Sequence, residues 1–257
     1  METLLLQIDI LWPAFAAGLF ILATHVPLGR EVLNRGIIFL DLAIAQMAAL
    51  GVVAASVILS EDQSHITQVF IAVTTAITSS LGLYSLRQLA VKVQEAIIGI
   101  VFILAATGSL LLLAADPHGG ERLKTLLVGQ ILWFQASDLI PLGITYASIA
   151  IIWMTLRKKL GAWLFYPLFA IAITVSTQIV GVYLVFASLI IPSLATLNRH
   201  HATVKGLLIG IIGYGGGLVF AAIFDLPAGA TIVWCLAITA LAYYLISRSL
   251  SVNHLKQ

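Results

Sequence analysis

The carboxylate of Asp41 is the group best suited to chemistry, because it stands alone in the apolar segment Ile37-Ile-Phe-Leu-Asp-Leu-Ala-Ile-Ala-Gln46. A charged side chain inside a membrane span is costly, so its presence is by default a functional hypothesis. Such a group could steer or bind a cation. Gln46 could add a carbonyl oxygen. It follows Asp41 by five residues, however, which places it about 140° from Asp41 round the axis of an ideal helix. A second interpretation stays open, in which Asp41 lies near a membrane interface and pairs with Arg35, or caps a broken helix.

A second candidate is the hydrophilic run Asp116-Pro-His-Gly-Gly-Glu121, which we expect in an outer loop. Carboxylate oxygens and imidazole nitrogens are ligands that suit divalent metals, so Asp116, His118 and Glu121 form a candidate metal site. A run rich in Gly, Pro and Asp is also typical of a simple turn. Both interpretations remain open at this point.

Several kinds of chemistry lack their residues in this sequence. No glycine loop of the GxxxxGK type is present, so any ATP that drives this protein is hydrolysed by another chain. No two histidines share a helix face, as an intramembrane enzyme would require. The single cysteine, Cys235, allows neither a disulfide framework nor a thiolate metal cluster. We therefore expect no catalytic residue and no cofactor bound by this chain.

The composition predicts an integral membrane protein. Of the 257 residues, 61% are hydrophobic and 9% are charged, and the mean hydropathy is +1.08. Ordinary soluble domains are about half apolar and about a quarter charged. A membrane β-barrel would alternate in polarity along segments of about 10 residues, whereas the runs 96–115 and 207–224 are apolar on nearly every face. The fold class predicted is an all-α, polytopic bundle of transmembrane helices forming a single domain over residues 1–257.

The apolar runs predict about eight to nine spans, because a helix needs about 20 residues to cross a bilayer. The seventh span is short and follows the sixth directly, so a broken or re-entrant helix, giving eight full spans plus a partial one, is an open alternative. Gly181 and Pro192 bracket it and are expected to break the helix. Pro227 and Gly229 are expected to form a tight turn before the last span. The spans predicted are 10–28, 36–59, 67–86, 95–115, 138–156, 162–180, 182–197, 205–224 and 228–247.

The basic residues predict the orientation, since Lys and Arg concentrate on the cytoplasmic side. With the N-terminus outside, 11 of the 13 basic residues face the cytoplasm, and only Arg122 and Lys124 lie outside. The C-terminus is then cytoplasmic and the number of crossings is odd.

Five segments carry a resemblance to a known family, and they occur in the family's order. The most specific is Gly181-Val-Tyr-Leu-Val-Phe-Ala-Ser-Leu-Ile-Ile-Pro-Ser-Leu-Ala195, and the others are 35–51, 95–102, 126–132 and 225–229. The chain resembles, nearly end to end, the permeases of the zinc/manganese/iron family of ATP-binding-cassette importers.

The resemblance implies a bacterial cytoplasmic (inner) membrane protein that transports a divalent metal, zinc or manganese, by ATP-driven alternating access. It implies a homodimer or a dimer with a similar permease, two cytoplasmic ATPase subunits that bind ATP, and an extracytoplasmic substrate-binding protein. The stretch after Pro192, through Asn198, Arg199, His200 and His201, corresponds to the ATPase-docking loop. Membrane lipid is a further partner, and no nucleic-acid partner is expected.

One departure from the family bears on the substrate. In its second helix the family has an Asp and, four residues later, a His that shares its helix face. Aligned on Gly51, those positions hold Leu42 and Gln46, and the only carboxylate is one place earlier, at Asp41. Gln offers a carbonyl oxygen but no imidazole. A harder ion, a weaker transit site, or a metal chelate or small organic solute all stay open, as does a secondary carrier driven by protons or sodium.

Overall fold

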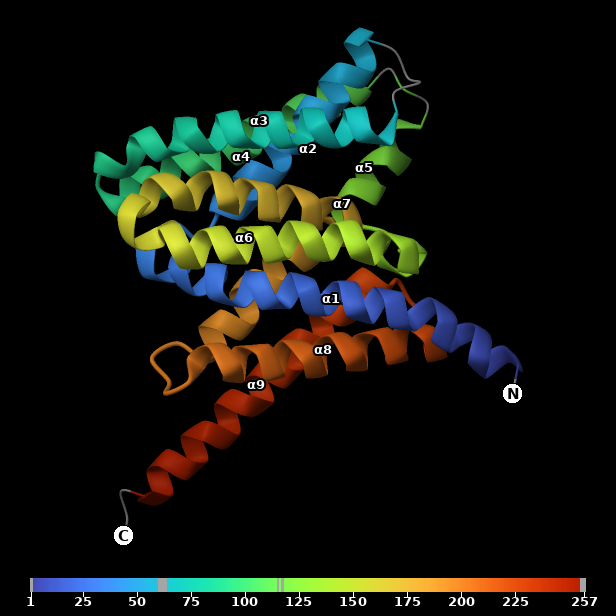
Figure 1. The fold of residues 1–257 in the computed structure, drawn as a ribbon, viewed down its shortest axis with the longest axis vertical. Coiled ribbons are helices and arrows are strands. Elements are labelled where there is room, and N and C mark those ends of the chain that lie inside the picture. The colour runs from blue at the N-terminus through green and yellow to red at the C-terminus, as the bar shows by residue number, and fades with distance from the viewer. Residues whose placement is uncertain (1, 60–63, 115, 117, 255–257) are drawn as a thin grey trace. The chain divides into compact units, whose positions relative to one another are not determined.

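The computed structural model describes residues 2–59, 64–114, 116 and 118–254, and all regular elements in this part of the chain are helical. Figure 1 shows the arrangement of the elements within each part of the chain. The α-helices are α1 Glu2–Arg35, α2 Leu40–Leu59, α3 His65–Ser85, α4 Val91–Leu113, α5 Gly119–Val128, α6 Leu139–Leu160, α7 Ala162–Ala195, α8 Ala202–Phe224 and α9 Ala228–His254. Short 3-10 turns occupy Leu86–Gln88, Ile131–Trp133 and Ala136–Asp138.

Eight of these helices are long and apolar enough to cross a membrane, and among the described α-helices α5 is the exception. The predicted all-α, polytopic class is therefore confirmed. Helices solve the main problem of a chain in lipid, since they satisfy backbone N–H and C=O groups within one segment. Small polar side chains are likewise satisfied within their own helix. The hydroxyls of Thr75 and Ser109, for example, donate to the carbonyls four residues earlier, at 2.8 and 3.0 Å.

Two compact units make up the chain, and the chain passes between them several times. One comprises residues 1–33, 130–144 and 183–257, and the other comprises 34–129 and 145–182. In the second unit α2 packs against both α3 and α4. Gly51 of α2 faces Thr75 of α3 without room for a side chain, so a small residue sets the spacing of these helices.

In the first unit α8 and α9 pack side by side (Figure 1). A Cβ atom on Gly213 would lie 2.6 Å from Leu236 Cδ2, and one on Gly217 would lie 2.5 Å from Ile232 Cα. Glycines on one face of α8 thus let the two backbones approach closely. The hydroxyls of Tyr214 and Ser188, 2.8 Å apart, join α8 to the last part of α7.

The sixth and seventh predicted spans correspond to α7, which consists of two helices joined across a kink at Gly181 (φ 76°, ψ 165°), so the expected break at Gly181 is confirmed. The backbone at Gly181 touches the end of α5. A Cβ on Gly181 would meet Val128 C at 2.5 Å and collide with Gly129 N, and Gly129 also has a positive φ of 72°. Only glycine fits both positions, because each combines a left-handed backbone with a backbone-to-backbone contact.

The expectation of a helix break at Pro192 needs correction. Pro192 lies inside α7, which continues as helix to Ala195. A proline removes one backbone donor, and in a packed membrane helix neighbouring groups accommodate this loss. Ser193, the next residue, donates its hydroxyl to Val26 O of α1 at 3.1 Å. The turn before α9 is present as expected: Asp225 has a positive φ of 52°, Pro227 precedes the first residue of α9, and Gly229 lies in its first turn.

The close contact at Gly181 yields a stability prediction. In Gly181→Ala the added methyl must enter the left-handed region and displace backbone atoms of 127–129, so we expect a loss of roughly 2 kcal/mol or more. Thermal unfolding of the purified chain in detergent measures it. The control is Gly82→Ala, because a Cβ at Gly82 meets nothing within 4 Å. Equal melting temperatures for the two variants would contradict the tight fit at Gly181.

Candidate cation site at the start of α2

The start of α2 positions Asp41. Helix α1 ends at Arg35, and Gly36 turns the chain with a positive φ of 71°. Leu40 N then donates to Ile37 O at 3.2 Å and Ala43 N donates to Phe39 O at 3.1 Å, which places Asp41 in the first turn of α2. The first turn of a helix carries unsatisfied N–H groups and a partial positive charge, so an acidic residue is stabilised there.

Asp41 is buried, with 1% of its surface exposed. Among the described residues, neither of its carboxylate oxygens has a hydrogen-bond partner. The Arg35 guanidinium lies 4.5 Å over the ring of Phe165. The interpretation in which Asp41 pairs with Arg35 therefore gains no hydrogen bond in its support. Asp41 does lie at a helix start, as the capping interpretation requires, yet its side chain makes no capping hydrogen bond.

Glu95 is the second acidic residue here, and the sequence reasoning did not single it out. It lies on α4, about one turn after the helix start at Val91. Its Oε1 accepts a hydrogen bond from the backbone N–H of Phe39 at 3.2 Å, two residues before Asp41. Its Oε2 is buried and has no partner among the described residues. An acidic residue at the edge of the predicted span 95–115 was the signal that could have identified it.

An open groove runs beside Glu95. Its volume is about 490 Å³. Its walls are the turn residues Gly36 and Phe39 and the beginning of α4, from Val91 to Gly99. Lys92, one turn before Glu95, is exposed and lines the same groove. Glu95 therefore lies at the wall of an open groove.

Gln46 does not join Asp41 in this arrangement. Both side chains are buried, at 4% and 1% exposure, and both belong to α2. Because α2 is a continuous helix, the five-residue separation keeps the two about 140° apart round its axis.

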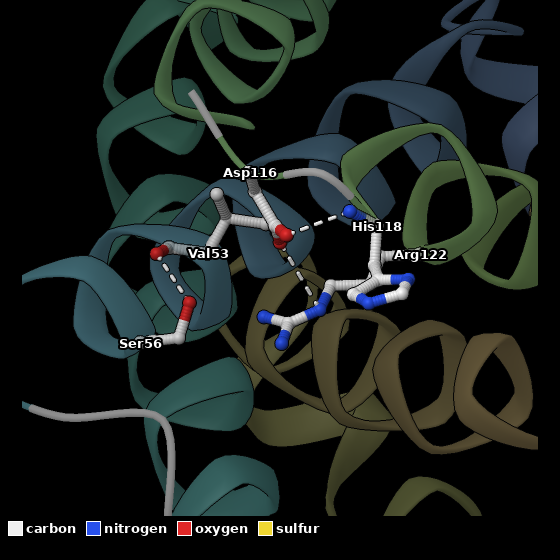
Figure 2. Close-up of polar contacts among 5 residues, drawn as sticks. All are labelled: Val53, Ser56, Asp116, His118 and Arg122. Carbon is white, nitrogen blue, oxygen red and sulfur yellow. Dashed lines mark hydrogen bonds and ion pairs between the residues drawn. The ribbon is translucent and has the colours of Figure 1, made fainter. Parts of the chain in front are cut away.

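The structure does not bring Asp116, His118 and Glu121 together as a metal site. Figure 2 shows Asp116 between the backbone N–H of His118, which donates to Oδ1 at 2.8 Å, and Arg122, whose Nε lies 3.3 Å from Oδ2. Within the described residues, no three His, Cys, Asp or Glu side chains gather as a metal would need. Asp116 instead holds the turn that leads into α5.

The residues expected to dock an ATPase lie between α7 and α8. Asn198 and His201 have positive φ values of 60° and 54°, and the rings of His200 and His201 lie 4.1 Å apart. Asn198, His200 and His201 are exposed, and Arg199 is partly exposed. Arg30 of α1 donates to the hydroxyl of Thr203 at the start of α8, which fixes this end of the segment. The segment is thus a compact exposed turn.

Comparison with known proteins places this arrangement in a family. A family model described as the ABC 3 transport family matches residues 7–170 and 159–247. The chain belongs to the ABC 3 transport family. It is a multi-pass membrane permease of ABC type, and the predicted resemblance is confirmed at this level.

Two solved structures share the fold. PsaBC from Streptococcus pneumoniae, solved in complex with a Fab, aligns with a TM-score of 0.67 at 20% identity over 93% of this chain and 89% of that one. A metal-chelate type ABC transporter in an inward-facing conformation aligns with a TM-score of 0.57 at 15% identity, over 93% and 80% of the two chains.

A curated relative is a membrane protein encoded in the ycf23-apcF intergenic region of Cyanophora paradoxa. It is 26% identical over 177 residues. The match covers 60% of this chain and 58% of that protein, so the chain spans less than two thirds of its length.

Proposed function

We propose that this chain is the membrane subunit of an importer that moves a divalent metal ion, manganese or zinc, across the bacterial cytoplasmic membrane. The observation that carries the proposal is the carboxylate of Asp41, which is buried in a membrane helix and lacks a hydrogen-bond partner among the described residues. An isolated buried charge is strongly unfavourable, so the group must be neutralised by a proton or a cation. A cation in transit would supply that neutralisation.

The energy source in this proposal is ATP hydrolysis in partner subunits. Membership of the ABC 3 transport family supports this and sets aside a secondary carrier. We place two ATPase subunits against the exposed turn of Asn198, Arg199, His200 and His201, which we assign to the cytoplasmic side. We also propose a second permease copy and an extracytoplasmic binding protein. In this orientation the N-terminus is outside and the C-terminus cytoplasmic.

A metal chelate is a second candidate substrate. Two observations favour it: the fold is shared with a metal-chelate type ABC transporter, and Gln46 provides no imidazole. A chelated metal keeps its ligands and needs fewer from the protein. Uptake of free and chelated forms of the same metal separates the two candidates.

Uptake by reconstituted vesicles tests the proposal. With the cognate ATPase and binding protein present, we expect ATP-dependent uptake of free Mn²⁺ or Zn²⁺. We expect Asp41→Asn to slow it by at least about tenfold, because Asn keeps the shape and loses the charge. Asp225→Asn is the control, since Asp225 is exposed and Asn tolerates its left-handed backbone. Hydrolysis of ATP without uptake of either free metal by wild-type vesicles would overturn the metal assignment.

Gln46 gives a selectivity prediction. An imidazole suits zinc, whereas oxygen ligands suit manganese. We therefore expect Gln46→His to raise the rate of Zn²⁺ uptake relative to Mn²⁺ by several-fold in the same vesicles, if Gln46 lines the pathway. Gln46→Asn, which retains an amide, serves as the matched control. An unchanged ratio of zinc to manganese uptake in Gln46→His would remove Gln46 from the pathway.

A further inference from the structure

Two carboxylates with buried oxygens that have no hydrogen-bond partner among the described residues meet at the start of α2, and they belong to helices far apart in the sequence. Asp41 is buried with both oxygens unpartnered among the described residues, and Glu95 of α4 has one buried oxygen, Oε2, in the same condition. Three acceptor atoms are therefore left without donors in one region. Buried polar atoms of this kind are rare and call for an explanation, such as an ion that the region binds.

A hydrogen bond fixes the position of the Glu95 carboxylate. Its Oε1 accepts from Phe39 N at 3.2 Å, and Phe39 lies two residues before Asp41 in the turn that opens α2. This hydrogen bond brings the Glu95 carboxylate to the turn in which Asp41 lies. Like charges so placed are stable only if a proton or a cation lies between them.

Two features beside the carboxylates bear on cation binding. The positive end of the α2 dipole stabilises negative charge in the first turn, where Asp41 lies, and so partly offsets the cost of burying it. The groove of about 490 Å³ opens beside Glu95. Lys92 also lines that groove, and Glu95 Oε2 accepts no hydrogen bond from it.

We propose that Asp41 and Glu95 together bind one hard divalent cation, with Glu95 as the residue that completes the site. The proposal rests on the proposed import of a divalent metal and deepens it by naming the second ligand and the class of ion. The ligands of this site are carboxylate oxygens, which suit Mn²⁺, Mg²⁺ or Ca²⁺. Ions that prefer thiolate or imidazole ligands fit it less well. Among transported metals this chemistry favours manganese over zinc. The Phe39 N–H fixes Glu95 Oε1 and leaves Oε2 for the ion.

Direct binding of Mn²⁺ to the full chain in lipid nanodiscs tests this site separately from transport. Free Mn²⁺ is measured by its electron paramagnetic resonance signal during titration. Glu95→Gln retains an oxygen that can accept the Phe39 N–H and loses only the charge. We expect at least a tenfold weaker affinity in Glu95→Gln and in Asp41→Asn. We expect the double variant to be little worse than either, because both residues serve one ion.

The controls separate binding from folding. Asp225→Asn removes an exposed carboxylate elsewhere and should bind Mn²⁺ as the wild type does. If Glu95→Gln does not yield a monodisperse protein, Glu95→Asp replaces it. That variant keeps the charge but draws it back by one methylene, and we expect an intermediate affinity. An unchanged affinity in whichever Glu95 variant is folded would overturn the proposal.

Binding and uptake distinguish failure of this site from failure of the importer. A wild-type chain that binds no Mn²⁺ would overturn the site. In that case a shared proton, and not a metal ion, would account for the two carboxylates. If vesicles that carry Glu95→Gln import metal as fast as wild-type vesicles do, the site is overturned and the importer stands. Mn²⁺ binding that requires Glu95, in vesicles that import neither metal, would support the site and overturn the importer.

Discussion

The burial of the Asp41 carboxylate is the constraint on which the functional account depends. A membrane span tolerates a charge only where something neutralises it. Three features position the carboxylates: the left-handed backbone of Gly36, the helix start that places Asp41 in the first turn of α2, and the hydrogen bond from Phe39 N to Glu95. In the part of the chain that the structure describes, these features leave both Asp41 oxygens and Glu95 Oε2 without a hydrogen-bond partner.

The glycines show how packing elsewhere supports helices without a hydrophobic driving force between them. Lipid is as apolar as the side chains, so close contact matters more than burial from water. Gly213 and Gly217 allow α8 to lie against α9, and Gly129 and Gly181 allow the end of α5 to touch the backbone of α7. The contact at Gly181 also explains why the helix is interrupted at that residue and not at Pro192.

Much of the fold was predictable because hydropathy dictates spans and Gly181 marked an interruption within an apolar run. The site was predictable only in part. Asp41 stood out because its own neighbours are apolar. Glu95 did not, since its significance depends on a contact with Phe39 that is 56 residues away in sequence. Asp116, His118 and Glu121 were misleading for the opposite reason. They are neighbours in sequence, yet the Asp116 carboxylate contacts the His118 N–H and Arg122, and the three side chains form no metal site within the described residues. Local patterns reveal a costly residue, but not the tertiary partner that accounts for it.

The most direct test of the account is the location of manganese in the assembled transporter. Crystals of the complex grown with Mn²⁺ would be examined for anomalous scattering at the manganese absorption edge. The account predicts a peak within ligand distance of both the Asp41 and Glu95 carboxylates, at the start of α2. A peak bound elsewhere along the membrane helices, with these two carboxylates still lacking any ligand, would contradict it.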